Sequence, residues 1–299
     1  MNRRIVPVTE PLDLARTARG VGTWGAAPWL RVDATGVWVA QRTAAGPGTI
    51  RLMHEGNELQ ATAWGPGAPD LLARAERLAG LHDDPSAVAP HHAVVAAALK
   101  RARGVRMASV DQVYPTLIAT ILAQKVTGKE SQAATMRLAR RWGEPAPGPR
   151  DDLWLFPAPR ALAQTPVAAF HPLGVERRRA QVLIEAATRI GRLEACVTMR
   201  GAQAMAHLQK LPGIGPWTAG VVVGEALGDP DAVPVGDYHL PNVVAFNLAG
   251  EPRADDARML ALLAPYAGQR GRVVRLLKSG GQPPPKWGPR SEARDIRGF

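Results

Sequence analysis

The segment LPGIG at residues 211–215 is the feature that most constrains how this 299-residue chain can fold. Gly213 and Gly215 allow a tight turn and a close approach of backbone to a ligand. Residues 202–210 have the apolar spacing of a helix, and Pro216 suits the first turn of a second helix. A lone glycine hairpin is often a plain turn, and a dinucleotide-binding motif would need a preceding strand. The segment therefore predicts a helix–hairpin–helix unit.

A helix that starts directly after a hairpin directs its N–H groups and the positive end of its dipole toward the turn. This arrangement suits a phosphate group. About twenty residues later, Asp237 lies in an irregular segment between Gly236 and Pro241. A phosphate-binding hairpin with a nearby carboxylate is the combination that an enzyme acting on a nucleic-acid backbone needs.

Composition limits the classes of partner and cofactor. A net charge of +11 favours a polyanionic partner. The single cysteine, Cys196, excludes an iron–sulfur cluster held by four cysteines and a disulfide framework, and we expect it to be buried. The chain has no apolar run of membrane-spanning length and no apolar signal core at its N-terminus, which predicts a cytoplasmic protein.

Residue patterns divide the chain into three parts and predict an α+β fold. Residues 1–90 form a small domain, with an edge strand near Ile5, an antiparallel meander over 29–64 and a covering helix over 70–81. Residues 91–278 are helical. Residues 279–299 form a basic tail rich in Gly and Pro, which we expect to be disordered.

Several segments resemble the helix-hairpin-helix (HhH-GPD) DNA glycosylase superfamily, and most of all its 3-methyladenine DNA glycosylase II branch. The resemblance is carried by LPGIGPWTA (211–219) and VPVGDYH (233–239), and extends to ILAQKVTGKESQAA (121–134), FPAPRALAQTP (156–166) and LGVERRRAQVLIEAA (173–187). It implies a small α+β domain followed by a helical bundle. It also implies a monomeric DNA glycosylase that flips out a damaged base of double-stranded DNA in base excision repair.

The resemblance gives roles to residues around the hairpin. Asp237 matches the catalytic aspartate, which stabilises positive charge on the sugar or orients a water. Some members carry a lysine nucleophile two residues after the second glycine, where this chain has Trp217, so we expect water chemistry without AP lyase activity. Trp217 can stack on a cationic alkylated purine, with core packing as the alternative. Tyr238 is a second candidate wall of the base pocket, and Val221 stands where the branch often has another aromatic residue.

The expected DNA contacts come from the hairpin, from a helix end near residue 125 and from two arginine clusters. At that helix end the family places a residue that enters the duplex; Gln124 and Lys125 are the candidates, and an ordinary polar helix end is the alternative. Arginines at the first turn of a helix are explained by nearby phosphates, because the helix dipole disfavours cations there. The expected contacts are Gly213, Ile214, Gly215, Thr218, Leu122, Gln124, Lys125, Arg177, Arg178, Arg270 and Arg272.

Other expectations concern cofactors and alternatives. The adjacent histidines His91 and His92 lack further ligands at metal-binding spacing, so we expect no metal site, and only a monovalent cation at the hairpin is left open. We expect the protein to be associated with the nucleoid. Two alternatives stay open: the same enzyme acting on oxidised or deaminated bases, and a non-catalytic DNA-binding module with the same hairpin.

Overall fold

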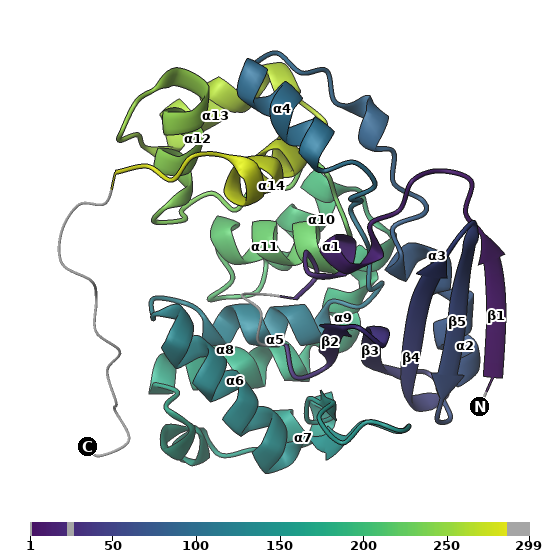
Figure 1. The fold of residues 1–299 in the computed structure, drawn as a ribbon. Helices are drawn as coiled ribbons and strands as arrows, with labels where there is room; N and C mark the ends of the chain where they lie inside the picture. Colours follow the sequence, from purple (N-terminus) through teal and green to yellow (C-terminus); the bar gives the residue numbers. More distant parts are fainter. Residues whose placement is uncertain (1, 23–26, 286–299) are drawn as a thin grey trace.

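The computed structural model describes residues 2–22 and 27–285, and it consists of an antiparallel sheet at one side of a helical region (Figure 1). The sheet has the order β1-β5-β4-β3-β2. Its strands are β1 (Asn2–Pro7), β2 (Leu30–Asp33), β3 (Gly36–Thr43), β4 (Gly46–Glu55) and β5 (Glu58–Trp64). The predicted meander and the edge strand are both confirmed. The predicted α+β fold class is confirmed with them.

Glycines with positive φ make the turns of the meander. Gly36, Gly46 and Gly56 have φ values of 120°, 125° and 56°, a region that costs glycine nothing. The helix predicted over 70–81 is divided into α2 (Ala68–Ala73) and α3 (Ala75–Leu78). The division lies at Arg74, whose φ of −92° and ψ of 0° leave the helical region. Helix α2 packs against β4 and β5.

The remaining elements are mostly helical. In chain order they are α1 (Leu14–Ala18), η2 (Pro85–Ala87), α4 (Ala93–Arg101), α5 (Tyr114–Leu122), α6 (Gly128–Trp142), β6 (Glu144–Pro145), β7 (Trp154–Leu155), α7 (Pro159–Ala163), η3 (Val167–Leu173), α8 (Arg177–Thr188), α9 (Ile190–Glu194), η4 (Ala195–Thr198), α10 (Gly201–Leu208), α11 (Pro216–Ala226), α12 (Leu240–Ala249), α13 (Asp256–Leu263), η5 (Ala264–Tyr266) and α14 (Arg270–Gly280). No helix in the described part of the chain is long and apolar enough to cross a membrane.

Two hydrophobic cores hold these elements together. The larger core is continuous from the sheet, for example Leu52, to α5, for example Leu117, and it includes the buried Cys196. Burial raises the pKa of the Cys196 thiol to about 12. The smaller core joins α4 to α12, α13 and α14. The division of the chain at residues 90–91 stays a prediction, and most of the predicted tail, residues 286–299, lies outside the described residues.

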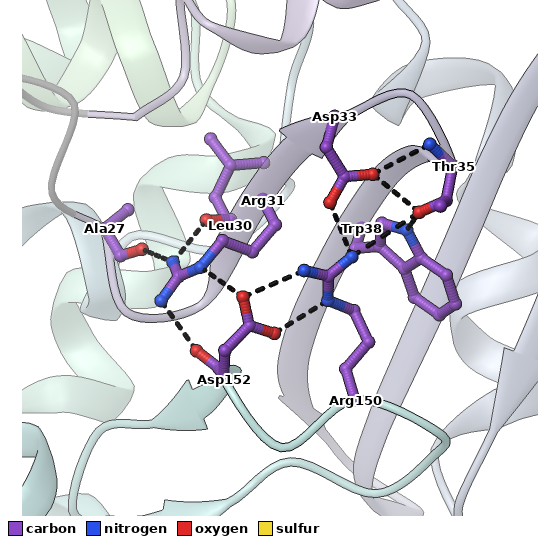
Figure 2. Close-up of polar contacts among 8 residues, drawn as sticks. All are labelled: Ala27, Leu30, Arg31, Asp33, Thr35, Trp38, Arg150 and Asp152. Atoms are coloured by element: carbon purple, nitrogen blue, oxygen red, sulfur yellow. Dashed lines mark hydrogen bonds and ion pairs between the residues drawn. The ribbon is translucent and has the colours of Figure 1, made fainter.

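A network of arginines and aspartates ties the β6–β7 segment to the sheet (Figure 2). The Arg150 guanidinium donates to both carboxylate oxygens of Asp152, at 2.7 and 2.8 Å, and to Asp33 at 2.6 Å. Arg31 Nε donates to Asp152 at 3.0 Å, and Arg150 also lies over the Trp38 ring at 5.4 Å. The hydrogen bonds from Arg150 lower the pKa of Asp152 to about 2.

Candidate active site

The hairpin between α10 and α11 has the geometry that its glycines predict. Gly213 has a φ of 91°, a region that strains any other residue, and a Cβ there would collide with Val182 of α8. Ile214 is buried, and its N–H donates to Leu211 O at 3.0 Å. Gly215 is extended, caps α11, and has open space where a Cβ would be. The hairpin thus presents bare backbone at the N-terminus of α11, as an anion site requires.

Gln124 fastens this hairpin to the loop between α5 and α6. Its Nε2 donates to Gly213 O at 3.0 Å and to Thr218 Oγ1 at 2.9 Å. Thr218 is only 2% exposed, so little of this residue is accessible to DNA. The neighbouring Lys125 is exposed and has a φ of 56°, which is rare for a residue with a side chain. Of the two candidates for entering a duplex, Gln124 is turned into the protein and Lys125 is turned outward.

Asp237 is held by three hydrogen-bond donors at the start of α12. Its Oδ1 accepts the backbone N–H groups of His239 and Leu240, both at 2.9 Å. Its Oδ2 accepts the indole N–H of Trp217 at 3.0 Å. Both side chains are half-buried. Gly236, with a φ of 92°, forms the turn that precedes Asp237 and places it beside the start of α12. The structure brings together the two residues that the sequence singled out for catalysis and base stacking.

The other predicted pocket residues are placed differently. Tyr238 is 86% exposed, and its ring lies edge-to-face with the His239 ring at a centroid distance of 4.9 Å. Its role as a wall of the base pocket stays a prediction. Val221 is buried within α11, one turn beyond Trp217. A hollow of about 460 Å³ lies elsewhere, beside Asp83, Met199 and Gln269, and no predicted site residue lines it.

Three of the residues predicted to contact DNA have partners within the protein. Leu122 is fully buried in α5. Arg272 is also buried, and it forms an ion pair with Asp83. Arg270 is held by Asp231, with Nε to Oδ1 at 2.8 Å and Nη2 to Oδ2 at 2.5 Å. Leu122 packs in the core and Arg272 is buried in an ion pair, which argues against direct DNA contact by these two side chains, whereas Arg270 pairs with Asp231 but stays 37% exposed. DNA contact by these three residues stays a prediction.

The arginine cluster of α8 divides into two kinds. Arg177 and Arg178 are exposed at the first turn of the helix, where a bound phosphate would offset their unfavourable position near its dipole. Arg179 is buried and donates from Nη1 to Leu122 O at 2.8 Å, and burial lowers the pKa of its guanidinium. No group of three or more His, Cys, Asp or Glu side chains within residues 2–22 and 27–285 could hold a metal ion.

Sequence comparisons match this chain to base excision repair proteins. Residues 118–263 match the family described as HhH-GPD superfamily base excision DNA repair protein. A putative DNA-3-methyladenine glycosylase (YfjP) of Bacillus subtilis is 28% identical over 149 residues, or 48% of this chain and 50% of that protein. DNA-3-methyladenine glycosylase 2 of Escherichia coli is 32% identical over 159 residues, or 52% of this chain and 54% of that protein. The matches thus span about half the length of these relatives.

Solved structures show the same fold over nearly the whole chain. A 3-methyladenine DNA glycosylase of Archaeoglobus fulgidus aligns with a TM-score of 0.73 at 15% identity, covering 93% of this chain and 97% of that one. An apo 8-oxoguanine glycosylase/lyase of Clostridium acetobutylicum aligns with a TM-score of 0.70 at 13% identity, covering 94% and 96%. At such identities the likeness concerns the fold.

Proposed function

Since the chain belongs, through residues 118–263, to the HhH-GPD superfamily of base excision DNA repair proteins, we propose that it is a monofunctional DNA glycosylase. Its substrates are alkylated purines of the 3-methyladenine and 7-methylguanine type in double-stranded DNA. The observation that carries this proposal is the carboxylate of Asp237, fixed by three donors beside the hairpin and the Trp217 ring. The names of the relatives in Bacillus subtilis and Escherichia coli support the substrate class.

The chemistry follows from the charge that builds up when the glycosidic bond breaks. Positive charge develops on the deoxyribose, and an oriented carboxylate stabilises that charge without moving. The same carboxylate can orient the water that attacks the sugar. An alkylated purine is itself cationic, and contact with the face of the half-buried Trp217 ring contributes about 0.5–2 kcal/mol. Asp237 and Trp217 thus act on the sugar and on the base respectively.

The absence of AP lyase chemistry is proposed from the residue at position 217. An indole has no nucleophilic amine, so it forms no Schiff base with the sugar. We therefore expect no covalent enzyme–DNA adduct on borohydride treatment during base release. A trapped adduct on a substrate that the enzyme excises would refute the monofunctional assignment.

The proposed DNA interface consists of the hairpin, the exposed Arg177 and Arg178, and Lys125. Backbone at Gly215 approaches a phosphate, and the two arginines add charge beside it. Lys125 is proposed to fill the space that the flipped nucleotide leaves, because it projects from the loop while Gln124 is bonded inward. The monomeric state, the nucleoid association and the lack of a resident cofactor stay predictions.

A base-release assay on a panel of duplexes tests the function. The panel contains 3-methyladenine, 7-methylguanine, 8-oxoguanine and hypoxanthine, each in the same sequence context. We expect the wild type to release the alkylated purines and Asp237→Asn to release none. The two proteins should bind the same duplex with affinities within a few-fold of each other, because Asp237 acts on transition-state charge. Release by Asp237→Asn at the wild-type rate would mean that another residue is catalytic. Duplex binding without release of any base by the wild type would favour a non-catalytic module.

A further inference from the structure

The hydrogen bonds of the Asp237 carboxylate are distributed unequally between its two oxygens. An ionised carboxylate offers about four lone-pair sites, two on each oxygen. Backbone N–H groups of His239 and Leu240 occupy Oδ1, and the Trp217 indole occupies one site of Oδ2. Among the described residues no further donor reaches Oδ2. The oxygen that can face a sugar or a water is therefore Oδ2, the one that the indole orients.

The indole is also connected to the hairpin. Trp217 is the second residue of α11, directly after Pro216 and the capping Gly215. Gln124 holds this turn through Gly213 O and Thr218 Oγ1. The backbone that carries the indole thus belongs to the same turn that is proposed to receive a phosphate.

We infer that Trp217 is a positioning residue for Asp237, and that its N–H, separately from its ring face, fixes the direction of Oδ2. The inference rests on the proposed function. It separates two properties of one side chain: the ring face, which is proposed above to contact a base, and the N–H, which orients the carboxylate. A misplaced reacting group lowers the rate of the chemical step while leaving the binding of DNA unchanged.

The test replaces one atom group in Trp217. Site-specific incorporation of 3-benzothienylalanine puts sulfur where the indole has N–H, and it keeps the size and face of the ring. We expect the single-turnover rate constant for 3-methyladenine release to fall by about 10- to 100-fold, with duplex affinity within twofold. In the Asp237→Asn background, which we expect to release no base, the same replacement should leave duplex affinity unchanged.

Two controls help to interpret the result obtained with the analogue. Trp217→Phe also removes the donor and should lower the rate at least as much as the analogue. Relative to the wild type, the Trp217 indole ¹H–¹⁵N resonance should shift in the variant Asp237→Ala. It should not shift in Asp231→Asn, because the carboxylate of Asp231 pairs with Arg270 instead. This measurement needs only folded protein and no activity.

The outcomes separate the inference from the proposed function. An analogue with a single-turnover rate within twofold of the wild type, or an indole resonance unmoved by Asp237→Ala, would overturn the positioning role, although the enzyme would still be a glycosylase. A wild type that releases no base from any duplex would overturn the function itself. In that case the resonance shift would still report whether the indole N–H is bonded to Asp237.

Discussion

Replacing Arg272 by alanine should destabilise the fold strongly, because it leaves a buried carboxylate without its partner. The side chains of Arg272 and Asp83 are 5% and 8% exposed, and Arg272 Nε also donates to Gln269 Oε1 at 2.8 Å. Removing one member of a buried ion pair costs about 3–5 kcal/mol. The total free energy of unfolding of a domain is about 5–15 kcal/mol, so the loss is a large part of it.

Urea unfolding followed by tryptophan fluorescence measures this loss. With a slope of about 2–3 kcal/mol per molar urea, the midpoint should fall by roughly 1–2.5 M. The double variant Arg272→Met with Asp83→Asn should recover part of the loss, because the charge is gone while an oxygen stays available to the N–H of Met107, now bonded at 2.8 Å. The variant Asp83→Asn alone is the matched control.

The result also decides between two roles for Arg272. If it bound DNA phosphates, Arg272→Ala would reduce the salt dependence of duplex binding and leave the unfolding midpoint nearly unchanged. We expect the opposite pattern. A midpoint within about 0.3 M of the wild type, which corresponds to less than about 1 kcal/mol, would refute the reasoning from burial.

Three further predictions concern other parts of the molecule. Replacing Arg177 and Arg178 singly by alanine should each reduce the slope of log affinity against log salt by about 0.9, measured by fluorescence anisotropy, with an unchanged unfolding midpoint; an unchanged slope would place the phosphate contacts elsewhere. Gly213→Ala should lower the free energy of unfolding in urea by about 1–3 kcal/mol, because the φ of Gly213 is positive and a Cβ there collides with α8. Gly215→Ala should fold normally and bind duplex DNA more weakly. Equal stability of the two variants would contradict this prediction. Asp152 has a pKa of about 2 in the folded chain and 3.8 as its ordinary value, so its contribution to stability is complete above about pH 4 and is lost as the pH falls through 2. The variant Asp152→Asn should lack this loss of stability in acid unfolding. Identical acid-unfolding curves for the variant and the wild type would contradict the prediction.

Features that depend on local sequence could be predicted. The turns of the sheet follow from glycines that adopt positive φ, and the start of α5 at Tyr114 follows from the Pro after it. The pairing of Trp217 with Asp237 was half predicted: the resemblance marked both residues, but no pattern in the sequence indicates that an indole N–H reaches a carboxylate twenty residues away.

Features that depend on distant partners could not be predicted. Arg272 resembles a phosphate-binding arginine at the start of a helix, and only the approach of Asp83, 189 residues away, makes it a buried ion pair. Gln124 resembles a polar residue at a helix end, and its acceptor Thr218 is 94 residues away. Hydrophobic periodicity in the sequence does not indicate whether a charged or polar side chain is buried. The role of such a side chain depends on which residues the fold places next to it.

The composition of the smaller core affects how the chain is made. Helix α4 (Ala93–Arg101) packs there with α12, α13 and α14, so Val95 is completely buried. During synthesis, however, the first of these partners, α12, emerges only after roughly 140 further residues, a wait on the order of ten seconds at about 5–20 residues per second. Throughout that interval the apolar face of α4 has no native surface to cover it. Helix α4 is therefore a segment where a nascent chain of this protein is exposed to aggregation and to chaperones.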